Sequence, residues 1–190
     1  MKLFYIITKY ILFPGSYLRG LWEHIACKIL RIPVEPVGYM RIDEACGHAE
    51  HSLAKTPFSS FFLVFFPGFM NFNMGVPLWL AGIMGIFYMG TTIYDNAVLF
   101  IFYLVCLYMG MSLLCALFPL SEDIYTFFEL VYNGESFREA SAGGKVLKAL
   151  VIILTFPMAL LTRAGAFLEK HGVNFILGIA VIIVYSVFVL

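Results

Sequence analysis

The sequence predicts an all-α polytopic membrane protein with about four or five transmembrane helices. The chain of 190 residues is 62% hydrophobic and only 13% charged, and its mean hydropathy is +0.91. A soluble domain of this size exposes more charge, so lipid is the expected solvent for most of the chain. Several apolar stretches also reach the length of about 20 residues that a spanning helix needs.

The N-terminal part predicts a broken helix followed by a polar loop. Residues 3–30 are apolar but interrupted at Pro14-Gly15, so we expect a retained first helix or its lead-in and a second helix from about Ser16 to Leu30. Residues 31–57 are polar and contain several prolines and glycines, which argue against a continuous helix. Short runs such as "VGYMRI" favour a small hairpin at the membrane surface.

The middle of the chain predicts two membrane segments of different character. Residues 58–90 are apolar but interrupted by Pro67-Gly68 and Pro77, which indicates one long broken helix or two short re-entrant helices. Discontinuous helices are tolerated in a membrane only where the freed backbone is buried in protein or lines a wet cavity. Residues 98–119 predict an uninterrupted span.

The C-terminal part predicts an interfacial helix and a final hairpin. Ser121 is a suitable N-cap, Glu122 and Asp123 favour a helix start, and apolar residues at helical spacing predict an amphipathic helix. Residues 120–146 would therefore form an amphipathic helix and a linker. Two further spans are expected, joined by a turn near "LEKHG", over residues 146–163 and 173–190.

Charge gives an orientation and excludes one class of partner. The 12 basic and 12 acidic residues balance to a net charge of zero, which argues against nucleic-acid binding. Basic residues gather near 28–57 and 138–148, so the positive-inside rule predicts that loops 31–57 and 120–146 face the cytoplasm. We expect one integral membrane domain over residues 1–190, in contact with membrane lipids.

One segment resembles a known family. "FPGSYLRGLWEHIACKILRIPVE", residues 13–35, resembles the zinc helix of site-2-protease-type intramembrane metalloproteases, in which a Pro-Gly turn precedes His-Glu-x-x-His. The later "ALFPLSED" is similar to the Phe-Pro-Ser-x-x-Asp element of short microbial members. The resemblance implies a membrane metalloprotease frame in a prokaryotic cytoplasmic membrane.

The matching positions have lost the catalytic residues. A metalloprotease helix needs two imidazoles at i and i+4, with a glutamate as general base. Arg19 and Glu23 replace the two histidines, and Gly20 replaces the base. Asp123 resembles the late aspartate of the family, although it also suits the start of a helix. These four positions form a degenerate site, in which Arg19 and Glu23 could pair with each other or contact headgroups and water.

A second group of residues offers metal ligands. Within "DEACGHAEH", residues 43–51, Cys46, His48 and His51 supply the thiolate and imidazole donors that suit zinc. Solvated histidines in a polar loop are the plainer interpretation. If the loop folds over the preceding helix, Glu23 or His24 could complete a ligand set.

Two asparagines lie inside the apolar 58–90 segment. Asn71 and Asn73 must form hydrogen bonds if they are buried at membrane depth. Bonds between helices are the simpler expectation, and a contact to a substrate backbone or an ion pathway is the alternative.

Three functions follow from these observations. We favour a catalytically inactive relative of the intramembrane metalloproteases without a cofactor, acting as a scaffold or as a subunit that binds another membrane protein or a second copy. The alternatives are a membrane zinc metalloprotease with rearranged ligands from Cys46, His48 and His51, and a small transporter or channel component built on residues 58–90.

Overall fold

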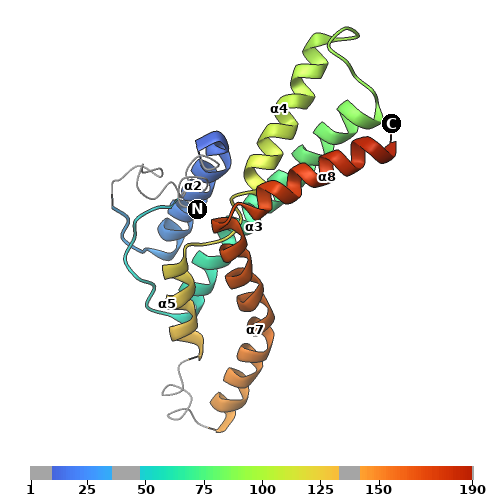
Figure 1. The fold of residues 1–190 in the computed structure, drawn as a ribbon. Helices are drawn as coiled ribbons and strands as arrows, with labels where there is room; N and C mark the ends of the chain where they lie inside the picture. The colour runs from blue at the N-terminus through green and yellow to red at the C-terminus, as the bar shows by residue number, and fades with distance from the viewer. Residues whose placement is uncertain (1–9, 36–47, 133–141, 190) are drawn as a thin grey trace.

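The structure, a computed structural model, describes residues 10–35, 48–132 and 142–189. These residues are helical and contain no strand, which confirms the predicted all-α class. The elements are α2 (Phe13–Leu30), α3 (Pro57–Ile83), the π-helix η1 (Met84–Tyr88), α4 (Ala97–Leu114), α5 (Ser121–Tyr132), α7 (Ala142–Lys170) and α8 (Val173–Val189) (Figure 1).

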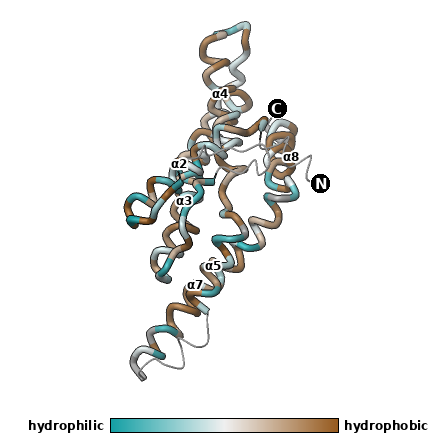
Figure 2. Tube along the Cα trace, turned by 90° about the vertical axis from the view of Figure 1, so that its left-hand side faces the viewer, coloured by the Kyte–Doolittle hydropathy of each residue, from teal (hydrophilic) through white to brown (hydrophobic). Residues whose placement is uncertain are grey.

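Within the described part of the chain, three helices are long and apolar enough to cross a membrane, by length and composition. They cover Pro57–Tyr88, Ala97–Leu114 and Gly144–Glu169, and the apolar part of α8, Val173–Val187, is shorter. Large hydrophobic side chains point outward along α7 and α8, such as Leu154 and Val187, and Figure 2 shows hydrophobic residues along both helices. A surface of this kind suits a lipid environment.

Residues 57–88 form one uninterrupted helical segment, so the predicted pair of short re-entrant helices is wrong. Thr56 caps α3 by accepting a hydrogen bond from the Ser59 amide, at 3.1 Å, and Pro57 lies in the first turn, where a missing N–H costs nothing. Pro67 and Pro77 both lie inside α3. Neighbouring helices can support such prolines, and α3 packs along both α2 and α4.

Helix α2 begins at Phe13, so the break expected at Pro14-Gly15 is the first turn of the helix. Proline is tolerated there because its fixed φ suits a helix start. Gly15 lies against the backbone of Ser112 in α4, where a Cβ atom would clash. The Ser112 hydroxyl accepts a hydrogen bond from the Gly15 amide and donates one to the Leu12 carbonyl, both at 2.7 Å. These contacts fix the start of α2 to the end of α4.

Helix α5 is present as predicted and packs between α3 and α7. Phe127 is fully buried and forms a cluster with Val64 of α3 and Ala159 of α7. This packing sets the position of the first turn of α5 relative to α2 and α3.

Helices α7 and α8 do not form the predicted hairpin. Gly172 ends the turn between them with φ of 70°, a left-handed conformation that favours glycine. Beyond this turn α8 runs away from α7 toward the far end of α3 (Figure 1). There the rings of Phe87 and Tyr185 meet with centroids 6.5 Å apart. Packing against η1, which continues α3, takes the place of the predicted antiparallel pairing with α7.

The polar loop is joined to the end of α2 by two backbone hydrogen bonds. The Glu35 amide donates to the Glu50 carbonyl at 2.9 Å, and the Ser52 amide donates to the Pro33 carbonyl at 3.2 Å. Among the described residues only an isolated antiparallel bridge, Val34 to His51, corresponds to the predicted hairpin. The run "VGYMRI" and Cys46 lie outside the described residues.

Candidate metal centre

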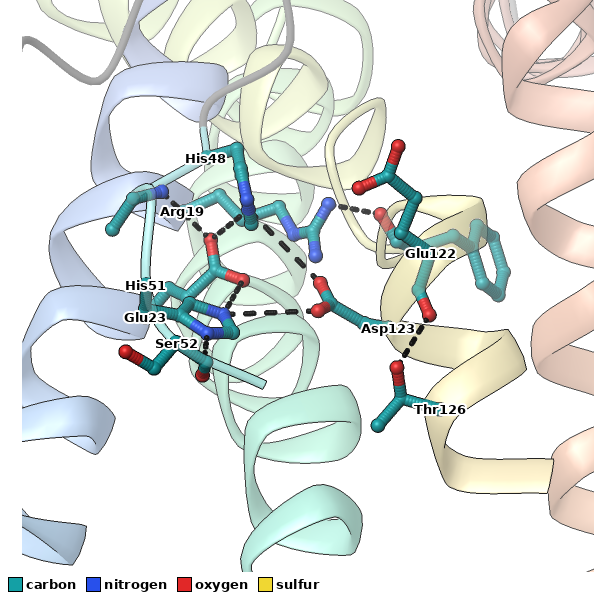
Figure 3. Close-up of polar contacts among 10 residues, drawn as sticks. Arg19, Glu23, His48, His51, Ser52, Glu122, Asp123 and Thr126 are labelled. Carbon is teal, nitrogen blue, oxygen red and sulfur yellow. Dashed lines mark hydrogen bonds and ion pairs between the residues drawn. The ribbon is translucent and has the colours of Figure 1, made fainter. Parts of the chain in front are cut away.

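Four side chains from three segments converge between α2 and α5. Glu23 comes from α2, His48 and His51 from the loop that precedes α3, and Asp123 from the first turn of α5 (Figure 3). Each offers one nitrogen or oxygen atom to the group, and these atoms all lie within 4.8 Å of one another. This set combines two imidazoles with two carboxylates, the donor types that zinc and related transition metals bind.

The separations within the group suit a single ion. His48 Nδ1 lies 2.9 Å from Glu23 Oε2 and 4.0 Å from Asp123 Oδ2, while His51 Nε2 lies 3.5 Å from Glu23 Oε1 and 3.7 Å from Asp123 Oδ1. Donor atoms about 2.0–2.1 Å from a tetrahedral zinc are about 3.3 Å apart. The shortest of the observed distances, 2.9 Å, is below this spacing, and the distances of 3.5, 3.7 and 4.0 Å are above it.

The orientation of His51 is set by its neighbour. His51 Nδ1 lies 2.9 Å from the Ser52 carbonyl, and a carbonyl only accepts, so Nδ1 carries the proton of this bond. In the neutral ring the lone pair is therefore on Nε2, the atom that faces Glu23 and Asp123. Histidines that ligate metals are commonly oriented by such a bond from the other ring nitrogen.

Among the described residues, three buried atoms of the group have no hydrogen-bond partner and contact their neighbours only in the ion pairs of 3.5–4.0 Å. They are Glu23 Oε1, His51 Nε2 and Asp123 Oδ2. Buried polar atoms in native proteins usually have partners, and exceptions call for an explanation such as an ion. Glu23 Oε2, in contrast, accepts from His48 and from the Ala49 amide at 3.0 Å. The partnerless atoms face the interior of the group, where an ion would satisfy all three.

The carboxylates in this group differ in proton affinity. Burial raises the pKa of Glu23, but His48, His51 and the charge of Arg19 together lower it to about 2. For Asp123, burial and the negative charge of Glu23 raise the pKa to about 6, against opposing effects of the two histidines and Arg19. Glu23 is therefore ionised at neutral pH, whereas Asp123 titrates near neutrality.

Both histidines bind protons more strongly than a free imidazole in the metal-free protein. Burial alone lowers the pKa of His51, yet Glu23, the Ser52 carbonyl and Asp123 raise it to about 9. The pKa of His48 is raised as well, because its contact with Glu23 outweighs burial. Without a metal ion, positive charge on these rings balances the carboxylates.

Arg19 does not make the contact that the sequence suggests. Both Arg19 and Glu23 are buried, which excludes the interpretation that they meet headgroups or water. Arg19 Nη1 donates to the Phe118 carbonyl instead of forming a direct pair with Glu23. The Phe118 amide in turn donates to Glu169 of α7 at 3.1 Å. A guanidinium removed from water needs acceptors, and the Phe118 carbonyl supplies one of them.

The other predicted residues have separate roles. Gly20 is buried in α2 and adds no side chain to the group. Asn71 is fully buried and donates to the carbonyls of Gly15 and Ala116, at 3.1 and 2.8 Å, so it joins helices as expected. Asn73 is exposed and donates to the Phe69 carbonyl of its own helix, at 2.8 Å, so the condition of burial is not met for Asn73.

Sequence reasoning named all four members of the group without assembling them. It expected Glu23 to meet His48 and His51 only if the loop folds over α2, and it assigned Asp123 to a helix start. The position of the loop on α2 and the approach of Asp123 to Glu23 both depend on tertiary contacts, which no local sequence pattern indicates. Ser52 and Glu169 were missed, since a serine beside a histidine and a glutamate at a helix end are ordinary features.

Comparison with known proteins identifies no relative of this chain. No family model, curated protein sequence or solved structure matches this chain. The chemistry of the candidate metal centre therefore rests on its own geometry.

Proposed function

We propose that this chain is a membrane zinc hydrolase with a rearranged metal site, built from Glu23, His48, His51 and Asp123. The observation that carries the proposal is the convergence of four buried or half-buried donors with three partnerless atoms among them. Within the cluster these atoms meet their neighbours only in ion pairs of 3.5–4.0 Å, which are longer than a hydrogen bond. A divalent ion satisfies them at once.

The distances suggest a division of roles within the group. Glu23 lies 2.9 and 3.5 Å from the two histidine nitrogens, whereas Asp123 lies 3.7 and 4.0 Å from them. We assign Glu23, His48 and His51 as the metal ligands, a His₂Glu set like those of known zinc hydrolases. With an ion bound to these ligands, Asp123 would be placed to hold the water that the ion activates and to accept its proton, the role that the resembled family gives to the residue replaced here by Gly20.

An inactive membrane scaffold is the second candidate. Glu23 already accepts hydrogen bonds from His48 and Ala49, and charged histidines would balance both carboxylates without an ion. Together with the replacements at Arg19 and Gly20, this supports a metal-free relative of the site-2-protease type that binds another membrane protein or a second copy.

We further propose a polytopic arrangement in the cytoplasmic membrane of a prokaryote. The three apolar helices would span the bilayer, with α8 adding a shorter segment, and loops 31–57 and 120–146 would face the cytoplasm. The exposed hydrophobic side chains of α7 and α8 support contact with lipid. The metal centre would then lie near the cytoplasmic surface, close to the start of α3.

The metal content of the purified protein tests the proposed function. The protein is prepared in detergent without chelator or polyhistidine tag, and transition metals are measured by mass spectrometry. The proposal expects about one zinc per chain, as for a mononuclear site. Less than about 0.1 metal ion per chain after incubation with zinc would reject the hydrolase and support the scaffold.

The orientation is tested by labelling from each side of the membrane. Lys55 is exposed beside the start of α3, and Tyr94 is 96% exposed in the connection to α4. In a background without native cysteines, K55C should react with an impermeant thiol reagent only in inside-out vesicles. Y94C should react only in right-side-out vesicles. Labelling of both from one side contradicts the orientation.

A further inference from the structure

Arg19 presents an unused hydrogen-bonding edge beside the metal centre. The side chain is 3% exposed, and only Nη1 has a partner, the Phe118 carbonyl. Nε and Nη2 are buried without partners. These two nitrogens form one edge of the guanidinium, from which two parallel N–H bonds can bind two oxygens of a phosphate or a carboxylate.

The unused edge is directed toward the metal centre. Arg19 precedes Glu23 by one helical turn on α2, so both side chains share a face of the helix. The charge of Arg19 acts on both Glu23 and Asp123. Figure 3 shows Arg19 next to His48 and Asp123.

The charge of the loaded site calls for an anion. A divalent ion and Arg19 bring three positive charges, and the two carboxylates bring two negative charges, while ligating histidines are neutral. Around the ion itself one positive charge remains, because the buried carboxylate Glu169 is separated from Arg19 by the Phe118 peptide, and an anion bound at the ion would compensate that charge locally. A monoanion would neutralise this positive charge, and two of its oxygens could accept hydrogen bonds from Nε and Nη2 of Arg19.

We propose that Arg19 and the metal ion together form a subsite for a phosphodiester, which makes a phosphodiester the substrate of the hydrolase; this inference rests on the proposed function. One non-bridging oxygen contacts the metal ion, and the Arg19 edge binds the phosphoryl group from the other side. A phosphodiester carries one negative charge, which matches the charge left over. Both histidines lie just before Pro57, where a candidate span begins, so the proposed membrane arrangement would bring the site close to phospholipid headgroups.

The reaction balances without any further reagent. The oxygen of water forms a bond to phosphorus, and one ester P–O bond breaks. One proton of the water passes by way of Asp123 to the leaving alkoxide, and the other stays on the phosphate. The products are a phosphomonoester monoanion and an alcohol, so the total charge is unchanged.

Anion binding to cobalt-loaded protein tests the subsite. Cobalt(II) takes the same donors as zinc and reports changes around the ion by visible absorption. Detergent without phosphate groups is used, and the probes are inorganic phosphate, dihexanoylphosphatidylglycerol, dihexanoylglycerol and acetate. The variants are R19Q, R19K, which keeps the charge but lacks the paired donors, and K28Q, which removes an exposed charge from the same helix.

We expect the phosphatidylglycerol to change the spectrum saturably and dihexanoylglycerol to have no effect. R19Q should bind cobalt but weaken phosphodiester binding by about tenfold or more, R19K by less, and K28Q should match wild type. Tighter binding of inorganic phosphate than of the lipid keeps the phosphoryl subsite but overturns the lipid source.

Two other outcomes separate the proposals. The subsite is overturned, and the metal centre remains, if cobalt binds but neither phosphate probe changes its spectrum. The same conclusion follows if R19Q binds the phosphodiester as tightly as wild type does, or if acetate binds more tightly than the phosphate probes. Failure of wild type to bind cobalt or zinc overturns the proposed function, and the phosphodiester inference falls with it.

Discussion

Glu23 Oε1 and His51 Nε2, both buried, form an ion pair at 3.5 Å, and neither has a hydrogen-bond partner among the described residues. This separation exceeds an ordinary N–H···O hydrogen bond, which is about 2.7–3.2 Å long. It is close to the spacing of two donors on one zinc ion. The pair is therefore the clearest sign of an ion position, and its behaviour separates a metal centre from an ion-pair cluster.

Removing an imidazole ligand should abolish zinc binding. H48Q and H51Q each lose one nitrogen donor, and zinc affinity should fall by at least about a hundredfold, because ligand loss exceeds the 10–100-fold cost of losing an outer-shell contact. Competition with a chromophoric chelator measures the affinity. H171Q is the matched control, since His171 lies at the α7–α8 turn and bonds to the Phe167 carbonyl. Equal affinity in wild type and H51Q would contradict the ligand assignment.

The metal-free protein should lose stability as the pH rises from about 6.5 to 9. The pKa of His51 is raised from 6.5 to about 9, so protonation of His51 favours the folded state. That contribution is complete below pH 6.5 and is lost as pH passes 9. The difference corresponds to roughly 3 kcal/mol. Thermal unfolding of chelator-treated protein across this range measures it.

Zinc should reverse this pH dependence. A ligating imidazole must be unprotonated, so protons compete with the ion and zinc-bound protein should gain stability over the same range. H51Q without metal should lack the loss assigned to His51. If the stability of the metal-free protein were constant between pH 6.5 and 9, contact with Glu23 would not raise the pKa of His51.

Local patterns predicted most helices but not their arrangement. The start of α5 could be predicted because Glu122 and Asp123 suit a first turn. The span that became α4 could be predicted from hydrophobicity alone. Pro67 and Pro77 were misleading, because a proline breaks an isolated helix while neighbouring helices can support it within a bundle. The orientation of α8 depends on packing near Phe87 and Tyr185, which no sequence pattern records.

The sequence indicates which residues could donate to a metal ion, but it does not indicate how they are arranged in space. His48 and His51 are close in sequence, and their imidazoles alone indicate zinc chemistry. Their meeting with Glu23 depends on backbone bonds between residues 33–35 and 50–52. Arg19 was expected to pair along its own helix, yet it bonds to Phe118, which is distant in sequence. Such long-range contacts follow from the fold and cannot be inferred from spacing.

Asn71 should contribute to stability through its bonds between helices. N71L removes donors to the carbonyls of Gly15 and Ala116, and we expect a loss of about 1–3 kcal/mol, given the modest value of single hydrogen bonds in membrane proteins. Unfolding in mixed detergent measures the change. N73L is the matched control on the same helix, because Asn73 is exposed and bonds only to Phe69 in the described contacts. Equal effects of both substitutions would contradict this role for Asn71.

Glu169 should control the metal centre from a distance by holding the Phe118 peptide. Its carboxylate accepts from the Phe118 amide while the Phe118 carbonyl accepts from Arg19, so one peptide group connects α7 to the site. E169A would leave a buried N–H without this partner, and we expect a loss of about 1–3 kcal/mol in stability. Zinc affinity should fall roughly tenfold, because the displaced segment leads to Asp123.

Two further variants separate positioning from a general effect of charge. In E169Q the amide oxygen can still accept from Phe118, so zinc affinity should return to within about threefold of wild type. E129A removes an exposed carboxylate from α5 and should leave zinc affinity unchanged. If E169Q weakens zinc as much as E169A does, the negative charge of Glu169 matters and the Phe118 contact does not. If E169Q restores zinc affinity and E129A leaves it unchanged, the loss in E169A comes from a displaced Phe118 peptide. That displacement would act on zinc binding through Arg19 and Asp123.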